Sequence, residues 1–151
     1  MQHYGYRYDY RSRSIGPDAY LGPLPEWAAE LAGRLAADTP VERAPDQVIV
    51  NEYLPGQGIS AHLDCVPCFG DVVLSISLGS ACVMAFAEPT TGTSVRVLVE
   101  PGALMVMSGD ARYAWRHSIA ARKSDLIAGR RFQRGRRVSL TFRTVLVGER
   151  A

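Results

Sequence analysis

Short segments of alternating apolar and polar residues, or of continuous apolar residues, dominate the chain after residue 46. The segments are QVIVNEYL (47–54), ISAHLD (59–64), DVVLSISL (71–78), ACVMAFAE (81–88), TSVRVLVE (93–100), ALMVMSG (103–109), YAWRHSI (113–119) and RVSLTFRTVLV (137–147). Each has the length and composition of a β-strand, and turn sequences rich in glycine and proline separate them. Many short strands at a spacing of about ten residues are typical of a sandwich or jelly roll, not of alternating β–α units.

The N-terminal part of the chain follows a different pattern. Tyr4, Tyr6, Tyr8 and Tyr10 recur at every second position, which predicts a strand with a tyrosine face over residues 2–14. A loop dense in proline and glycine follows this strand.

A helix is expected over residues 25–38, with Pro25 near its start. Trp27, Leu31 and Leu35 recur at i, i+4 and i+8, so they are expected to form its buried stripe.

The composition is that of an ordinary globular protein. The 151 residues fit one domain, with 47% hydrophobic and 21% charged residues. No apolar run approaches the roughly 18 residues that span a membrane, and the N-terminus lacks the apolar stretch of a signal peptide. We therefore expect a cytoplasmic protein with no membrane partner. Three cysteines, an odd number, argue against a disulfide framework.

The net charge of +2 is too small to indicate a nucleic-acid partner by itself, but the positive charges are concentrated. The basic residues of one segment are Arg122, Lys123, Arg130, Arg131, Arg134, Arg136 and Arg137, against the single acid Asp125. The segment overlaps the longest irregular stretch, residues 120–135. It is either a phosphate-binding surface or a solvated loop.

His62 and Asp64 are candidate metal ligands. Alternation along a strand points both side chains to the same side, which lets them converge on one ion. Two histidines and one carboxylate are the ligand set of iron(II) oxygenases, and the third ligand would be His3 or His117. The pair by itself is a weak signal, because a hydrogen-bonded histidine at a strand end explains it equally well.

Cys65 and Cys68 have the CxxC spacing of zinc and redox sites. A structural zinc ion requires four such ligands, and a thioredoxin-like pair opens a helix in a β–α–β context. Neither context is present, so we interpret the pair as incidental to the chemistry.

The strand RVSLTFR (137–143) alternates strictly, which places Arg137 and Arg143 on one face and apolar residues on the other. Two inward-facing arginines require an anionic partner, and a dianionic acid such as 2-oxoglutarate would satisfy both. The alternative is an edge strand with a solvated face. Asn51 and Tyr53 share a face in the same way and are expected to hydrogen-bond the same acid, although Tyr53 also suits simple strand packing.

Taken together, the motifs resemble those of the AlkB family of iron- and 2-oxoglutarate-dependent dioxygenases. The motifs are NEYLPGQGISAHLD, SISLGS followed by MAF, PGALMVMSGDARYAWRH, and RRVSLTFR. They stand in the family's order over residues 47–145, with a weaker match at 2–10. Within the family, QHYGYRYDY and SGDARYAWRH are similar to the branch that contains transfer-RNA-modifying oxygenases.

The resemblance implies a mainly β double-stranded β-helix (jelly roll) with one or two N-terminal flanking helices. It implies a single domain, 1–151, in which residues 1–24 form a substrate-lid strand and loop and residues 47–147 form the catalytic jelly roll. Its cofactors would be Fe(II), 2-oxoglutarate and O2.

The resemblance also assigns residues to roles. The implied iron ligands are His62, Asp64 and His117, and the implied 2-oxoglutarate-binding residues are Asn51, Tyr53, Arg137, Ser139 and Arg143. The implied substrate-binding residues are Tyr4, Tyr6, Tyr8 and Arg112. The alternatives are strand packing for the tyrosines and a turn salt bridge from Arg112 to Asp110.

The implied function is oxidative demethylation of alkylated bases in DNA or RNA, with nucleic acid, including transfer RNA, as partner and a monomer as the expected state. Alternatives are hydroxylation of a modified transfer-RNA uridine or a protein side chain, and a catalytically silent nucleic-acid-binding barrel. Val66 stands where some family members carry an acid that reads adenine, which argues against alkylated adenine. Ser118 replaces the glycine that usually follows the distal histidine.

Overall fold

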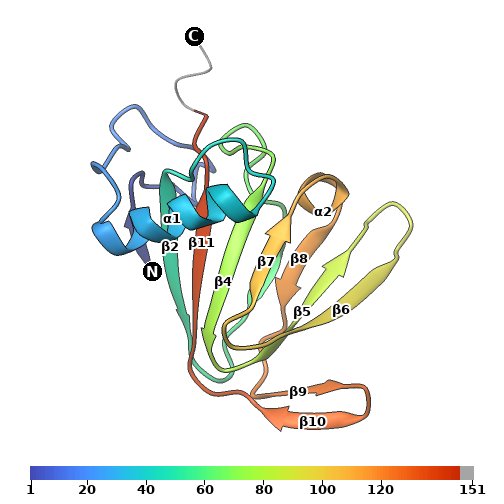
Figure 1. Cartoon of the computed structure of the whole chain (residues 1–151). Helices are drawn as coiled ribbons and strands as arrows, with labels where there is room; N and C mark the ends of the chain where they lie inside the picture. Colours follow the sequence, from blue (N-terminus) through green and yellow to red (C-terminus); the bar gives the residue numbers. More distant parts are fainter. Residues whose placement is uncertain (147–151) are drawn as a thin grey trace.

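Two antiparallel β-sheets face each other in the computed structural model, which describes residues 1–146 (Figure 1). The larger sheet has the order β1-β2-β11-β4-β7 and the smaller one the order β3-β8-β5-β6, while β9 and β10 form a separate hairpin. The strands are β1 (Gln2–Tyr4), β2 (Gln47–Tyr53), β3 (Ile59–His62), β4 (Val73–Gly79), β5 (Cys82–Ala87), β6 (Ser94–Val99), β7 (Leu104–Met107), β8 (Arg116–Ile119), β9 (Ser124–Ile127), β10 (Arg130–Gln133) and β11 (Arg137–Arg143). The helices are α1 (Glu26–Asp38) and the single turn α2 (Asp110–Tyr113).

The predicted mainly β jelly roll is confirmed by this arrangement of two facing antiparallel sheets. Each strand predicted after residue 46 corresponds to an observed strand within a few residues. The single-domain organisation stays a prediction, and residue 147 lies outside the described residues. None of the described helices has the length and apolar character needed to cross a membrane.

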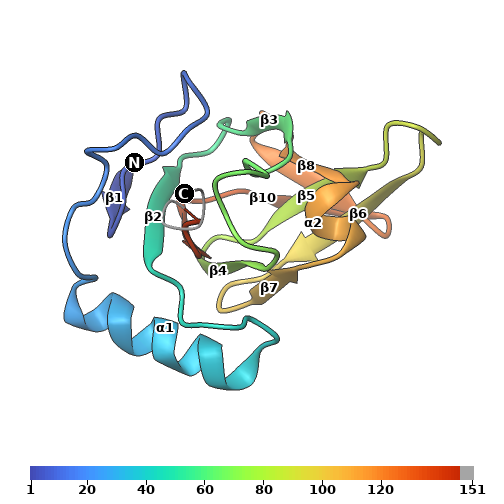
Figure 2. The same ribbon diagram turned by 90° about the horizontal axis from the view of Figure 1, so that it is seen from above.

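Helix α1 lies across the outer face of the larger sheet (Figure 2). The expected stripe is only partly right, because α1 buries Ala28, Ala32 and Leu35, whereas Trp27 is 41% exposed. Small alanine side chains let the helix backbone approach the sheet closely. Trp27 instead packs edge-on against Tyr4, with ring centroids 5.6 Å apart.

Strand β11 lies between β2 and β4, and its two faces differ. One face packs in the apolar layer beneath α1, and the other points to the space between the two sheets. Its even-numbered residues Val138, Leu140 and Phe142 pack in the same cluster as α1. The pairing with β2 and β4 is antiparallel and in continuous register, so the odd-numbered residues all point to the opposite face, between the sheets. The alternation predicted for this strand is therefore observed in full.

The long N-terminal strand predicted over residues 2–14 is wrong. Strand β1 ends at Tyr4, because Gly5 has a positive φ of 79° and a Cβ at this position would lie 2.0 Å from the Asp46 carbonyl oxygen. Only glycine fits there. The chain then forms isolated bridges, so successive tyrosines no longer share a face.

The segment 120–135, predicted as an irregular loop, instead contains the hairpin β9–β10. The hairpin is anchored by Arg134, whose guanidinium forms two hydrogen bonds with the buried carboxylate of Asp125, at 2.6 and 2.8 Å. Asp125 also accepts a hydrogen bond from the Val83 amide of β5. Two further members of the basic segment, Arg130 and Arg131, are exposed.

Candidate metal centre and cosubstrate pocket

The pairing of β3 with β8 brings two histidines together. Ile59 lies opposite Ile119, and after an irregularity in the register His62 lies opposite His117. Directly opposite residues of an antiparallel pair project to the same face. The two imidazole centroids are 4.3 Å apart.

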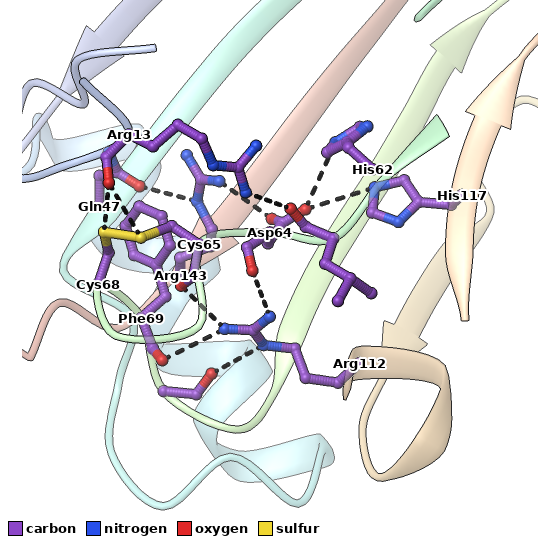
Figure 3. Close-up of polar contacts among 12 residues, drawn as sticks. Arg13, Gln47, His62, Asp64, Cys65, Cys68, Phe69, Arg112, His117 and Arg143 are labelled. Atoms are coloured by element: carbon purple, nitrogen blue, oxygen red, sulfur yellow. Dashed lines mark hydrogen bonds and ion pairs between the residues drawn. A yellow bond between two sulfur atoms is a disulfide. The ribbon is translucent and has the colours of Figure 1, made fainter. Parts of the chain in front are cut away.

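Asp64, which follows β3, completes the cluster (Figure 3). Its Oδ1 lies 3.7 Å from Nε2 of His62 and 3.4 Å from Nε2 of His117. Its Oδ2 accepts a hydrogen bond from Nη1 of Arg143 at 3.0 Å. Oδ1 therefore faces both histidines, whereas Oδ2 is hydrogen-bonded to Arg143.

The protonation states suit metal binding. Nδ1 of His62 lies 2.8 Å from the carbonyl oxygen of Ser60, which keeps the proton on Nδ1 and the lone pair on Nε2. Burial lowers the pKa of His62, so the ring is neutral at pH 7. Burial by itself raises the pKa of Asp64, but the hydrogen bond with His117 and the charge of Arg143 outweigh it and hold that pKa well below its usual range.

This donor set fits an Fe(II) ion. The ligand atoms of His62, Asp64 and His117 all lie within 4.8 Å of one another. Two imidazole nitrogens and one carboxylate oxygen on one side of an ion are the facial set of non-haem iron(II) oxygenases, which leaves the other positions open. Among residues 1–146, these three side chains meet the distance requirement for holding a metal ion.

A cavity of about 260 Å³ opens beside this cluster. The predicted site residues that line it are Tyr8, Asn51, Tyr53, His62, Asp64, His117, Arg137, Ser139 and Arg143. The structure thus brings together the predicted metal ligands and the predicted 2-oxoglutarate-binding residues, which come from both sheets and the loop after β3, and Tyr8 from the N-terminal segment.

Arg137 provides a buried positive charge in this cavity. The residue is 3% exposed, and its Nε donates a hydrogen bond to the Ser77 hydroxyl at 2.9 Å. Its guanidinium carbon lies 5.3 Å from the centre of the Tyr53 ring. Among the described residues no carboxylate pairs with Arg137. A buried guanidinium without a counter-ion is a site for an anionic ligand. Sequence reasoning did not identify Ser77 as its partner.

Arg143 is differently placed from Arg137. It contacts Asp64 through Nη1, donates from Nε to Gln47 Oε1 at 3.0 Å, and stacks 3.9 Å above the Phe69 ring. Its Nη2 is buried and has no partner among the described residues. The arginine therefore orients the candidate iron ligand, and the part of its guanidinium that lacks a partner is buried.

The assignment of Arg112 to substrate is contradicted by its position. The side chain is 2% exposed and does not line the cavity. Its guanidinium donates to the carbonyl oxygens of Asp64, Cys65, Phe69 and Gly70 at 2.7–3.3 Å (Figure 3). No salt bridge with an acid is formed within residues 1–146. Arg112 therefore holds the segment that follows β3.

The tyrosines predicted to cover the substrate separate into two groups. Tyr8 lines the cavity, whereas Tyr4 packs against Trp27 and Tyr6 against Tyr20, away from it. For Tyr4 and Tyr6 the substrate role is thus contradicted, because the turn at Gly5 ends the common face.

Two exposed residues, Tyr10 and Arg13, line the entrance of the cavity instead. Neither is assigned to substrate by the sequence motifs. The tyrosine series does include Tyr10, but alternation alone does not indicate which members face the cavity.

The CxxC segment forms an intramolecular bond that the sequence pattern did not predict. Cys65 and Cys68 are joined as a disulfide, and Cys82 is free and buried. An odd cysteine count argues against a framework of several bridges, but it does not exclude one local pair.

Comparisons with known proteins agree with this geometry. A model of the 2OG-Fe(II) oxygenase superfamily matches residues 1–143. The solved structure of OsALKBH1 superposes with a TM-score of 0.65 at 20% identity, covering 95% of this chain and 76% of that one, which shows the same fold.

Three curated relatives illustrate the sequence similarity. Mouse "tRNA (carboxymethyluridine(34)-5-O)-methyltransferase ALKBH8" is 38% identical over 96% of this chain and 24% of its own length. Protein L905 of Acanthamoeba polyphaga mimivirus is 34% identical over 92% of this chain and 68% of its own. "Alkylated DNA repair protein ALKBH8 homolog" of Arabidopsis thaliana is 31% identical over 96% and 49%. The chain thus spans about a quarter of the mouse protein.

Proposed function

Since this chain belongs to the AlkB family within the 2OG-Fe(II) oxygenase superfamily, and is thus a 2-oxoglutarate-dependent dioxygenase, we propose a substrate for it. The proposed reaction is oxidation of an alkyl group carried by a base of transfer RNA. The observation that carries the proposal is the cavity in which three features lie together: a histidine–aspartate–histidine cluster, an aromatic entrance, and a buried arginine that has no carboxylate partner among residues 1–146. The enzymes of this superfamily use Fe(II), 2-oxoglutarate and O2.

In this proposal the cosubstrate lies between Arg137 and the metal cluster. Arg137 binds the distal carboxylate, and Tyr53 and Ser139, which line the same cavity, hydrogen-bond to it. Asn51 and Arg143 serve the metal-proximal carboxylate, since both line the cavity and Arg143 contacts the candidate iron ligand Asp64. Bound Fe(II) at His62, Asp64 and His117 supplies the activation of O2 that drives oxidation of 2-oxoglutarate and of the substrate C–H bond.

The entrance of the cavity suits a base presented out of its stack. Tyr8 and Tyr10 offer aromatic surfaces, with ring centroids 4.7 Å apart, and Arg13 adds a positive charge at the same place. A base that is oxidised must leave its stack, and aromatic and arginine side chains receive such bases by stacking. Several relatives have names that refer to transfer RNA, which favours this nucleic acid as substrate.

The bond between the alkyl group and the base decides the product. Hydroxylation of a methyl group on a ring nitrogen gives a hemiaminal, which releases formaldehyde and the unmodified base; this is the oxidative demethylation expected from the motifs. Hydroxylation of a side chain attached through carbon gives a stable alcohol. The second outcome is favoured by the relatives named for carboxymethyluridine 34.

The metal assignment is tested with Asp64→Ala. We expect Fe(II)-dependent turnover of 2-oxoglutarate to be lost, and binding of Mn(II), measured by its paramagnetic signal, to be weakened. Arg116→Ala, an exposed residue one position before the ligand His117, is the control and should turn over normally. Full turnover in Asp64→Ala would exclude this cluster as the metal site.

The substrate assignment is tested with bulk transfer RNA and a panel of N-methylated oligonucleotides, incubated with Fe(II), ascorbate and 2-oxoglutarate. Mass spectrometry of the nucleosides and a formaldehyde assay distinguish the products. Formaldehyde with restored bases indicates demethylation, and a gain of one oxygen on a transfer-RNA base indicates hydroxylation. Turnover that changes none of these nucleic acids, while a protein side chain is oxidised, would refute the proposal.

A further inference from the structure

His3 lies in the edge strand of the larger sheet, on the side that faces the cavity. Strand β1 pairs with β2, and His3 lies directly opposite Ile49 (Figure 2). Opposite residues of an antiparallel pair project to the same face, and Ile49 lines the cavity. Within residues 1–146, His3 belongs neither to the cavity lining nor to the metal cluster. This histidine, one of the two candidates for the third metal ligand in the sequence, therefore has another role.

The imidazole of His3 binds the backbone of the segment that follows β1. The Tyr8 amide, five positions further along the chain, donates a hydrogen bond to Nδ1 of His3 at 3.2 Å. An imidazole nitrogen accepts only when it carries no proton, so this contact requires a neutral His3 with its proton on Nε2. The side chain thus fixes the backbone beyond the turn at Gly5.

A series of ring contacts leads from His3 toward the metal cluster. The His3 ring packs edge-on against Tyr10 with centroids 6.2 Å apart, and Tyr10 packs edge-on against Tyr8 at 4.7 Å. Tyr8 is 6% exposed, and the guanidinium carbon of Arg143 lies 5.4 Å from the centre of its ring. Arg143 in turn is hydrogen-bonded to Asp64. His3 therefore contacts both tyrosines of the entrance, one through its backbone and the other through its ring.

The surroundings of His3 favour its neutral form. Burial lowers the pKa of His3, and the positive charges of Arg143, the N-terminal amine and Arg7 lower it further. The β2 residues that pair with β1 are uncharged. Asp9 is hydrogen-bonded by two backbone amides of its own turn, and none of the ion pairs among residues 1–146 involves His3. The charged residues that share a surface hollow with His3 are Arg7, Asp9, Arg11 and Asp18.

From these contacts we propose that His3 is a positioning residue for nucleic-acid substrates: it holds residues 8–13, the lid segment, so that Tyr8 and Tyr10 present their rings at the cavity entrance. The task needs a hydrogen-bond acceptor and a flat ring together, and histidine supplies both. The role in substrate binding rests on the proposed function, whereas the position of the lid segment does not.

Nuclear magnetic resonance of the ¹⁵N-labelled full chain, in the presence of a chelator, tests the hydrogen bond directly. At pH 7.5 the His3 ring should carry its proton on Nε2, and Nδ1 should show a scalar coupling to the Tyr8 amide nitrogen across the hydrogen bond. A proton on Nδ1 would overturn the proposal, because that nitrogen could then not accept.

Two substitutions separate the acceptor from the ring. His3→Asn places an amide oxygen at the position of Nδ1 and removes the ring, whereas His3→Phe keeps a ring and removes the acceptor. At pH 7.5 the Tyr8 amide should exchange with solvent roughly threefold to tenfold faster in His3→Phe than in wild type, the factor that one hydrogen bond contributes to a local opening equilibrium. His3→Asn should stay close to wild type. Equal exchange in His3→Phe and wild type would refute the role of the acceptor.

The pH dependence of this exchange distinguishes positioning by His3 from a general effect on packing. The contact is complete above the ordinary histidine pKa of about 6.5 and weakens below it, because the proton that an open lid segment binds is excluded by the contact. Corrected for the intrinsic rate, exchange of the Tyr8 amide should rise by up to about tenfold from pH 7.5 to pH 5.5 in wild type.

The same exchange should be independent of pH in His3→Asn, which has no titrating group at this position. The Ser77 amide, which donates to the Ala103 carbonyl oxygen, is the internal reference and should not change. A rise of equal size in wild type and His3→Asn would assign the effect to other groups and contradict the proposal. This comparison does not need His3→Phe, so it decides the matter even if that variant does not fold.

Kinetics connect the lid segment to the substrate. His3→Phe should raise KM for the nucleic acid several-fold and leave KM for 2-oxoglutarate unchanged, since the contacts of Arg137 are with Ser77 and Tyr53. His3→Asn should restore the lower KM at pH 7.5. If no nucleic acid is oxidised, the resonance and exchange measurements still decide whether His3 holds the lid segment. If His3→Phe oxidises nucleic acid with the wild-type KM, the proposed function stands and the positioning of substrates by His3 fails.

Discussion

Buried arginines perform three different tasks around one cavity. Among residues 1–146, Arg137 has no carboxylate partner, Arg143 contacts the aspartate of the metal cluster, and Arg112 donates only to backbone carbonyl oxygens. A buried guanidinium is costly unless its charge and donors are satisfied. The partner of each arginine therefore indicates its role better than its burial, which is nearly the same for all three.

Arg137→Ala is predicted to raise KM for 2-oxoglutarate roughly 10- to 150-fold, the equivalent of about 1.5–3 kcal/mol for hydrogen bonds to a charged group. The steady-state rate at varied 2-oxoglutarate concentration gives this value. Arg136→Ala removes the neighbouring exposed arginine, which pairs with Glu52, and should change KM by less than a factor of about two. An unchanged KM in Arg137→Ala would rule out its contact with the cosubstrate.

Arg112→Ala is predicted to lower the free energy of unfolding by about 3 kcal/mol or more, because four carbonyl oxygens lose a charged donor in a buried place. Urea denaturation measures the change. Arg116→Ala, exposed on β8, is the comparison and should lie within about 0.5 kcal/mol of wild type. A fully stable Arg112→Ala protein with a raised KM for nucleic acid would instead support direct contact with the substrate.

Pairing between elements, not any single motif, assembles the metal cluster. The register of β3 against β8 puts His62 opposite His117, and β11 delivers Arg137 and Arg143 to the same interior between β2 and β4. The hairpin β9–β10 is joined to β5 by the hydrogen bond from the Val83 amide to Asp125, whose carboxylate is also paired with Arg134.

Asp125→Asn is predicted to destabilise the protein by about 3–5 kcal/mol at pH 7, since it leaves the buried charge of Arg134 unpaired. Burial by itself raises the pKa of Asp125, but hydrogen bonds from Arg134 and the Val83 amide outweigh it and lower that pKa. A carboxyl with a lowered folded-state pKa stabilises the protein above its unfolded pKa of about 3.9, and this contribution is lost as the pH falls through the folded-state value.

The stability difference between wild type and Asp125→Asn should therefore be constant from pH 7 to about pH 5 and narrow below about pH 4. Urea denaturation across this range measures it. Asp38→Asn, at the exposed end of α1, is the matched control. A difference that persists unchanged in acid would contradict the ion-pair explanation.

At the scale of the whole molecule, the basic hairpin and the cavity entrance lie at different ends. Hairpin β9–β10 projects from the end of the sandwich opposite the N-terminal lid (Figure 1). Because the two regions lie at different ends, we expect a folded RNA, and not a short oligonucleotide, to contact both. If the substrate is the transfer RNA proposed above, we expect the exposed charges of Arg130 and Arg131 to contribute to binding of the folded RNA and not of a short oligonucleotide.

The double variant Arg130→Glu/Arg131→Glu is predicted to weaken transfer-RNA binding several-fold and to flatten its salt dependence, by a slope of about 0.9 for each phosphate that is no longer neutralised. Binding and turnover of a short single-stranded substrate should not change. Arg34→Glu on α1 is the control for net charge. Equal losses for long and short substrates would argue against binding of RNA by the hairpin.

The strands and several site residues can be predicted from the sequence because their cause is local. Alternation with a period of two determines both faces of β11. The same alternation makes His62 and Asp64 candidate metal ligands, and the resemblance to a family strengthens this otherwise weak signal. The order of four motifs indicates the family, and the superfamily match supports it.

Tertiary structure alone decides what depends on contacts between distant segments. One close approach, between Gly5 and the Asp46 carbonyl, ends the tyrosine strand, and four carbonyl acceptors direct Arg112 toward the backbone and away from the substrate. The Cys65–Cys68 pair lies against the Arg13 carbonyl oxygen only because the fold brings the N-terminal segment over it. Local periodicity specifies which side of a strand is buried, but the partners that a buried polar group finds are set by packing across the whole fold.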